Sequence, residues 1–198
     1  MTDAYRFDES STEQAIAYAK IYAGENYSPA METVLKVAFS EKRNLPTFRL
    51  KSSDTILLSG YMKKWVGAYL AGYNNRPSVR TGNCSGTHPD PMAKTILRAR
   101  ISGLEDNLAD KIVARHSLLM TIENNIGELL EEYLSVKLSP LGWYCCWGST
   151  IDAVDFCKAD GSLLQIKTSD NSENSSSSRV RQGTPIGKWF RRFSRRPG

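Results

Sequence analysis

The sequence has few of the residues that usually hold transition metals, with two histidines and four cysteines among 198 residues. The cysteines are spaced neither as paired Cys-x-x-Cys knuckles nor as the framework of a small disulfide-rich protein. The histidines lie far from most of them in sequence, so we expect no zinc site and reduced, structural thiols. The residues concerned are Cys84, Cys145, Cys146, Cys157, His88 and His116.

The sequence also lacks a long hydrophobic run. No stretch of about eighteen apolar residues is present, so no transmembrane helix is expected. The N-terminus is polar and acidic, unlike a secretory signal, and a cytoplasmic protein is expected. A hydrophobic content of 40% and a charged content of 24% are typical of one globular domain with a substantial core.

Acidic residues are absent from the C-terminal twenty positions. Residues 179–198 hold seven of the 26 basic residues and none of the 21 acidic ones, so residues 1–178 carry a net charge of −2. The overall charge of +5 is therefore a C-terminal feature. A polyanionic partner would be met there, although a solvated basic tail explains the same charge.

The N-terminal part of the chain has patterns typical of helices. Helices are predicted over residues 10–23, 30–39, 54–73, 90–100 and 104–118, with a long loop at 74–91. The clearest helix is predicted over 121–138, where Pro140 follows. Its expected core-facing side consists of Ile122, Ile126, Leu129, Leu130, Tyr133 and Leu138.

The C-terminal part reads as β structure. An aromatic strand is predicted from Trp143, followed by a hairpin over 151–157 and 162–168 with its turn at Asp160-Gly161. A short helix is expected at 185–193. The fold class is therefore α+β or α/β, with a helix-rich N-terminal half before a mixed sheet. We expect a mainly helical region at 1–120 and a functional core at 121–198, packed as one domain.

The hairpin predicts a cluster of chemically useful side chains. Gln165 and Lys167 share a face because strand side chains alternate, and the turn folds Asp155 back beside them. Phosphodiester hydrolysis needs a divalent cation and positive charge at the phosphate. Asp155 and Gln165 offer oxygen ligands that suit Mg²⁺, and Lys167 offers the charge.

One aspartate is a small ligand set, so a helix glutamate is expected to assist. Glu131 is the first choice and Glu128 the second. Two alternatives stay open at this point. Polar residues on one face of a surface strand produce the same pattern without catalysis, and Asp152 could be the ligand while Asp155 pairs with Lys158.

The segments ENNIGELLEEYL (123–134) and VDFCKADGSLLQIKTSD (154–170) together resemble the core of PD-(D/E)XK nucleases. This resemblance implies a restriction-endonuclease-like sheet and Mg²⁺-dependent endodeoxyribonuclease activity. Gln165 stands where an acidic residue is commoner, which weakens the implied metal site. Such nucleases usually continue with more strands and a helix, whereas 31 residues follow Lys167. We therefore expect a C-terminally shortened member, whose activity would be compromised.

The continuation QIKTSDNSENSSSSRVRQGTPIGKWFR (165–191) resembles the SinI family of type II restriction endonucleases. This resemblance implies a restriction–modification enzyme that cleaves double-stranded DNA within a short G-G-(A/T)-C-C-type sequence, and it implies a homodimer. No membrane association and no organic cofactor are expected.

The basic segment supplies groups that bind phosphates and read base edges. The expected DNA-binding residues are Asn171, Asn174, Arg179, Arg181, Gln182, Lys188, Arg191 and Arg192. The loop at 76–91 is a second candidate. Other functions remain open: a non-catalytic DNA-binding module, a helical interaction protein, and a nuclease that recognises repair intermediates or junctions.

Overall fold

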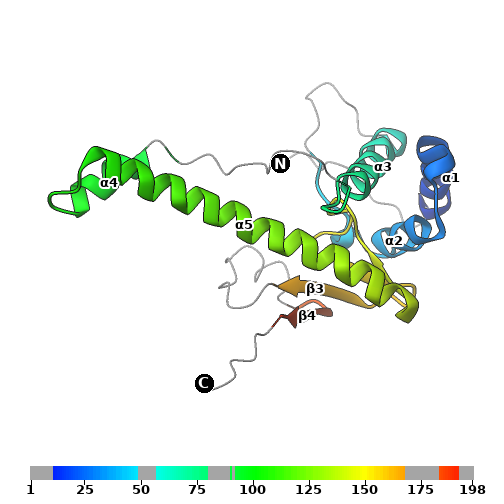
Figure 1. Ribbon diagram of the computed structural model, residues 1–198. Coiled ribbons are helices and arrows are strands. Elements are labelled where there is room, and N and C mark those ends of the chain that lie inside the picture. Colours follow the sequence, from blue (N-terminus) through cyan, green and yellow to red (C-terminus); the bar gives the residue numbers. More distant parts are fainter. Residues whose placement is uncertain (1–10, 49–56, 80–89, 91, 168–182, 192–198) are drawn as a thin grey trace, which may run out of the picture.

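The computed structural model describes residues 11–48, 57–79, 90, 92–167 and 183–191 (Figure 1). Helix α1 (Thr12–Ala23), α2 (Pro29–Ser40) and α3 (Leu58–Asn74) lie together and confirm the helices expected in this region. The start of α2 follows from its sequence, because Pro29 occupies the first turn and Ser28 Oγ accepts a hydrogen bond from the Met31 N–H at 3.2 Å. Single-turn 3-10 helices occupy Gly24–Asn26, Lys42–Asn44 and Ser139–Leu141.

Helix α4 (Met92–Arg100) folds back on α5 (Asp106–Leu138), which extends well away from α1, α2 and α3 (Figure 1). The expectation of two helices, at 104–118 and 121–138, was wrong, because α5 is continuous. Residues 117–122 contain neither glycine nor proline, so the backbone hydrogen bonds run through this stretch without interruption. No helix in the described ranges is both long enough and apolar enough to cross a membrane.

The core-facing side of α5 differs from the expected one. Leu130, Leu134 and Leu138 pack against the sheet, whereas Leu129 and Tyr133 are exposed. The apolar residues of this helix follow two separate stripes, and sequence periodicity does not show which of two stripes is buried.

The sheet has the order β1-β2-β3-β4. Strands β1 (Trp143–Cys145), β2 (Phe156–Lys158) and β3 (Leu163–Lys167) are antiparallel neighbours, which confirms the hairpin. Strand β4 (Ile186–Phe190) pairs in parallel with β3. The short helix expected at 185–193 was therefore wrong. The unpaired edge of β3 offers main-chain partners that outweigh the local preference of this segment.

Helices cover both faces of the sheet. Leu130, Leu134 and Leu138 of α5 pack with Cys145, Phe156 and Ile166 on one face. The larger core lies on the other face, where Cys157 and Leu163 join the buried residues of α1, α2 and α3. This arrangement confirms an α+β protein with a helix-rich N-terminal half and a mixed sheet. The division at residue 120 stays a prediction.

Candidate active site

The turn between β2 and β3 is built as the sequence predicts. The Lys158 N–H donates to the Ser162 carbonyl at 2.9 Å, and Gly161 has a φ of 87°. Glycine adopts such a positive φ without the penalty that a side chain would add. Asp160 Oδ1 accepts from the Ser162 N–H at 2.9 Å. The turn therefore fixes the register that brings Asp155 next to the C-terminal half of β3.

Hydrogen bonds of both its main chain and its side chain hold Asp155 in place. Its carbonyl accepts from the Cys146 N–H at 2.8 Å, and its N–H donates to the Leu164 carbonyl at 3.0 Å. Its carboxylate oxygen Oδ2 accepts from the Ile166 N–H at 2.6 Å. A charged acceptor makes this last bond stronger than an ordinary main-chain bond. The side chain is therefore locked at the point of β3 that separates Gln165 from Lys167.

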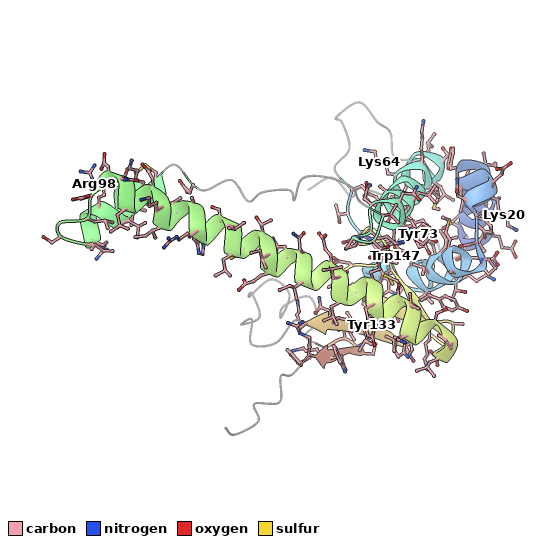
Figure 2. All side chains as sticks on the ribbon, viewed as in Figure 1. Lys20, Lys64, Tyr73, Arg98, Tyr133 and Trp147 are labelled. Carbon is pink, nitrogen blue, oxygen red and sulfur yellow. The ribbon has the colours of Figure 1, made fainter. Side chains whose placement is uncertain are left out.

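The loop that leads to Asp155 is clamped against α3. A Cβ on Gly148 would lie 2.0 Å from the Ala68 carbonyl oxygen, and a Cβ on Gly72 would lie 2.4 Å from the Gly148 nitrogen, so the two backbones touch. The buried Trp65 indole donates to the Thr150 carbonyl at 2.9 Å. Tyr73 and Trp147 add an edge-to-face contact, with ring centroids 5.8 Å apart (Figure 2). These contacts give the aspartate a rigid support.

Glu131 brings a second carboxylate to the same place from α5. Burial raises its pKa to about 8, with further increases from the negative charges of Asp155 and Glu128 and an opposing effect of Lys167. Burial also raises the pKa of the Cys145 thiol, with further increases from the negative charges of Glu131 and Asp155. Asp155, Glu131 and Lys167 are therefore close enough to act on one another electrostatically. The role of Glu131 as the helix glutamate of a metal site stays a prediction.

Gln165 is 7% exposed, and its Oε1 has no hydrogen-bond partner within the described part of the chain. A buried carbonyl oxygen that accepts no hydrogen bond is uncommon, and a bound ligand would supply the missing partner. Alternation along β3 places Gln165 and Lys167 on the face of Leu163, opposite the α5-covered face of Leu164 and Ile166. Gln165 thus lies on the other face of the strand from the helix that carries Glu131.

The donor chemistry of these residues fits a hard cation. Among the described residues, no group of three or more His, Cys, Asp and Glu side chains is arranged to hold a metal ion. A cation would therefore rest on the carboxylates of Asp155 and Glu131, whereas Gln165, the third ligand expected from the sequence, lies on the opposite face of β3 from Glu131. Oxygen ligands of this kind suit Mg²⁺ and not the softer transition metals.

The alternative residues lie elsewhere. Asp152 is exposed, in a loop whose main chain bonds to the Asn44 carbonyl at 2.9 Å. The Lys158 ammonium lies 5.0 Å from the centre of the Trp143 ring. His116 is exposed on α5. Glu128 is exposed but still influences Glu131.

From the loop at 76–91, Arg76 stacks on Tyr73 and pairs with Glu132 at 3.4 Å, whereas Arg80, Asn83 and His88 lie outside the described residues. Arg76 thus ties the end of α3 to α5.

Of the expected DNA-binding residues, two are described. Lys188 is the register partner of Gln165 on β4, so it shares a face with Gln165 and Lys167. The Arg191 N–H donates to the Lys167 carbonyl at 3.0 Å. Strand β4 therefore places the ammonium of Lys188 beside β3, on the same face as Lys167. The helix expected at 185–193 did not predict this position. Asn171, Asn174, Arg179, Arg181, Gln182 and Arg192 lie outside the described residues.

The α+β architecture, with an acidic helix on a sheet that carries Asp155 and Lys167, is of the restriction-endonuclease-like type. Comparison with known families gives the same result, because the SinI restriction endonuclease family matches residues 52–198. The chain belongs to this family.

Two relatives are similar over 115 residues, which is 56% of this chain and 50% of each relative. They are the type II restriction enzyme SinI of Salmonella infantis, 46% identical, and the type II restriction enzyme Eco47I of Escherichia coli, 44% identical. The chain thus spans about half the length of the curated relatives that it matches.

Proposed function

We propose that this chain hydrolyses double-stranded DNA at a short specific sequence, as a Mg²⁺-dependent type II restriction endonuclease. The observation that carries the proposal is the position of the Asp155 carboxylate. It is bonded to the main chain of β3 between Gln165 and Lys167 and lies within electrostatic range of Glu131. The membership of the SinI family and the names of the two relatives support the same reaction class.

In this proposal, the carboxylates of Asp155 and Glu131 would hold the Mg²⁺. Gln165 lies on the opposite face of β3 from Glu131, and its expected role as a third ligand is tested by the Gln165→Glu variant. When bound, the cation compensates the negative charge that develops at the phosphodiester. Lys167 adds a positive charge beside the scissile phosphate and orients the attacking water through its ammonium. The hydrogen bond from the Ile166 N–H keeps the Asp155 carboxylate in one orientation, so its geometry is set before DNA arrives.

Digestion of plasmid DNA with Mg²⁺ tests the reaction. The wild-type chain is expected to give discrete fragments, and Asp155→Asn and Lys167→Ala are each expected to reduce the rate about a hundredfold or more. Asp160→Asn is the matched control, because this carboxylate lies on the same hairpin but supports only the turn. Equal digestion by all four proteins would remove the catalytic assignment.

The same assay separates the competing functions. Nicking of branched DNA without discrete plasmid fragments would indicate a junction nuclease. Binding without cleavage would indicate a non-catalytic module. The ends of the fragments test the recognition sequence, for which we propose a G-G-(A/T)-C-C type. Action as a homodimer and a cytoplasmic location belong to the same proposal.

The basic segment is proposed to hold the DNA. In this role Asn171, Asn174, Arg179, Arg181 and Gln182 lie at bases or adjoining phosphates. Lys188, Arg191 and Arg192 bind the backbone. Proximity of Lys188 to Gln165 in the β3–β4 register supports this assignment.

The salt dependence of DNA binding tests these contacts. Loss of two phosphate contacts in Arg179→Ala/Arg181→Ala is expected to flatten the slope of log affinity against log salt by about 1.8. Lys20→Ala/Lys64→Ala is the control, because these lysines lie on α1 and α3, well away from β4 (Figure 2). An unchanged slope for the arginine variant would exclude Arg179 and Arg181 from the interface.

A further inference from the structure

Glu132, the neighbour of Glu131 on α5, binds the chain that follows α3. Its carboxylate oxygen Oε2 accepts from the Ser78 N–H at 2.8 Å, and Oε1 accepts from the Ser78 hydroxyl. The Arg76 Nε lies 3.4 Å from the same Oε1. Only 14% of the Glu132 side chain and 25% of the Arg76 side chain are exposed, so this ion pair is partly shielded from salt. Bonds to a charged acceptor are stronger than neutral ones, and the carboxylate is therefore firmly held.

The same contacts extend to the loop that leads to Asp155. The Arg76 guanidinium lies 4.1 Å from the centre of the Tyr73 ring, and its Nη1 donates to the Tyr73 carbonyl at 2.6 Å. Tyr73 in turn packs edge-to-face against Trp147 of that loop (Figure 2). Glu132 is thus connected, through the end of α3, to the segment that positions Asp155.

Glu131 lies between two attachments of α5. At about 100° per residue, it points in a direction between those of Leu130 and Glu132. Leu130 packs against the sheet, whereas Glu132 is bonded to the chain that follows α3. Apolar packing is non-directional and restrains rotation of α5 about its axis only weakly. The polar contact on the other side of Glu131 opposes such a rotation, because hydrogen bonds weaken steeply when they are misaligned.

A small rotation of α5 would separate the two carboxylates of the candidate site. Side-chain ends lie about 6 Å from a helix axis, so a turn of about 20° moves the Glu131 carboxylate by about 2 Å. The Asp155 carboxylate would stay in place, since it is bonded to the Ile166 N–H. A misplacement of about 1 Å can lower a rate about a hundredfold. The rotation of α5 therefore decides whether both carboxylates reach one cation.

We propose that Glu132 is a positioning residue. Its bonds to Ser78 and Arg76 set the rotation of α5, and this rotation brings the carboxylate of Glu131 to that of Asp155. Two consecutive glutamates thus have different roles, one at the site and one in its support. The positioning itself stands on the contacts of Glu132, whereas its effect on DNA cleavage rests on the proposed function.

The distance between α5 and the hairpin tests the rotation without DNA or Mg²⁺. Nitroxide labels are attached at Val136→Cys and Ala159→Cys, two exposed positions. Glu132→Ala is expected to shift or broaden the label–label distance by about 2 Å or more, because a turn of about 20° moves a side chain by this amount. Glu132→Gln keeps an acceptor for the Ser78 N–H and is expected to give a smaller change. Glu123→Ala, at an exposed glutamate of α5, is the control and is expected to change nothing.

Two precautions assign the measured distance to one chain and to the two labels. The labelled chain is diluted with unlabelled chain, so distances between copies do not contribute. The cysteines of the described residues are buried, and Cys84 is replaced by serine in every labelled chain. A distance distribution of Glu132→Ala that matches that of Glu123→Ala would overturn the proposal.

Cleavage kinetics test the catalytic consequence. Glu132→Ala is expected to lower kcat at least about tenfold with little change in KM, since a misplaced Glu131 affects the reaction and not DNA binding. In a Glu131→Gln background, Glu132→Ala is expected to have no further effect. Rate losses that multiply would show that Glu132 does not act through Glu131 and would overturn the proposal. A wild-type chain that cleaves no DNA would remove the proposed function, and the label distances would still decide the role of Glu132.

Discussion

The carboxylate of Asp155 takes a place in the sheet that a main-chain carbonyl would normally occupy, because it accepts the hydrogen bond of the Ile166 N–H at 2.6 Å. A structural bond and a proposed ligand are thus combined in one side chain. The two roles are separable, because an amide oxygen can accept the hydrogen bond but brings no charge.

Asp155→Asn and Asp155→Ala separate these roles. The asparagine variant keeps an acceptor for the Ile166 N–H, so its free energy of unfolding is expected to stay within about 1 kcal/mol of wild type. The alanine variant leaves that donor unsatisfied and is expected to lose about 1–3 kcal/mol. Both are expected to lose DNA cleavage. Denaturant unfolding measures the difference, and equal stabilities would show that the bond contributes little.

Glu131→Gln tests the electrostatic cluster through the pH dependence of stability. The pKa of Glu131 rises from 4.5 to about 8 in the folded protein, so the folded state holds a proton that the unfolded state releases between these values. Stability of the wild type is therefore expected to fall as pH rises from about 4.5 to about 8 in the absence of divalent ions.

The Glu131→Gln variant should lose less stability over this range, because glutamine does not titrate. Thermal unfolding at pH 5 and pH 8 measures the effect, with Glu123→Gln on the exposed part of α5 as control. A Glu131→Gln variant that follows the wild type at both pH values would show that this carboxyl is not held in a buried, acidic setting.

Gln165→Glu tests whether the glutamine is a ligand. A third carboxylate is expected to lower the Mg²⁺ concentration needed for half-maximal cleavage, because carboxylates bind this cation more strongly than amides. Without a cation, the added buried negative charge is expected to lower the melting temperature. Gln165→Leu serves as the comparison. A Mg²⁺ requirement that is the same in all three proteins would exclude Gln165 from the ligand set.

Gly148→Ala tests the clamp on the loop that leads to Asp155. The new Cβ would meet the Ala68 carbonyl oxygen at 2.0 Å, and φ is already 69°. A loss of about 3 kcal/mol or more is expected, from the clash together with the unfavourable φ. Gly161→Ala is the matched control, since its φ is 87° but nothing lies within 4 Å of the new Cβ. If both variants unfold at the same denaturant concentration, the close approach to α3 is not rigid.

The residue pattern alone predicted most of the elements that position the candidate site. Asp160-Gly161 specified the turn, Pro29 and Ser28 specified a helix start, and period-two alternation placed Gln165 beside Lys167. These are local properties, because turn geometry, capping and alternation depend on residues that are neighbours along the chain.

Only the tertiary structure decided which strands pair and which face of α5 is buried. Residues 186–190 became a parallel strand because β3 had an open edge, and the buried stripe of α5 was chosen by the shape of the sheet beneath it. Likewise, Glu131 is set apart from its neighbouring glutamates by burial against Asp155. Pairing and burial depend on residues far apart in sequence, so a local pattern cannot determine them.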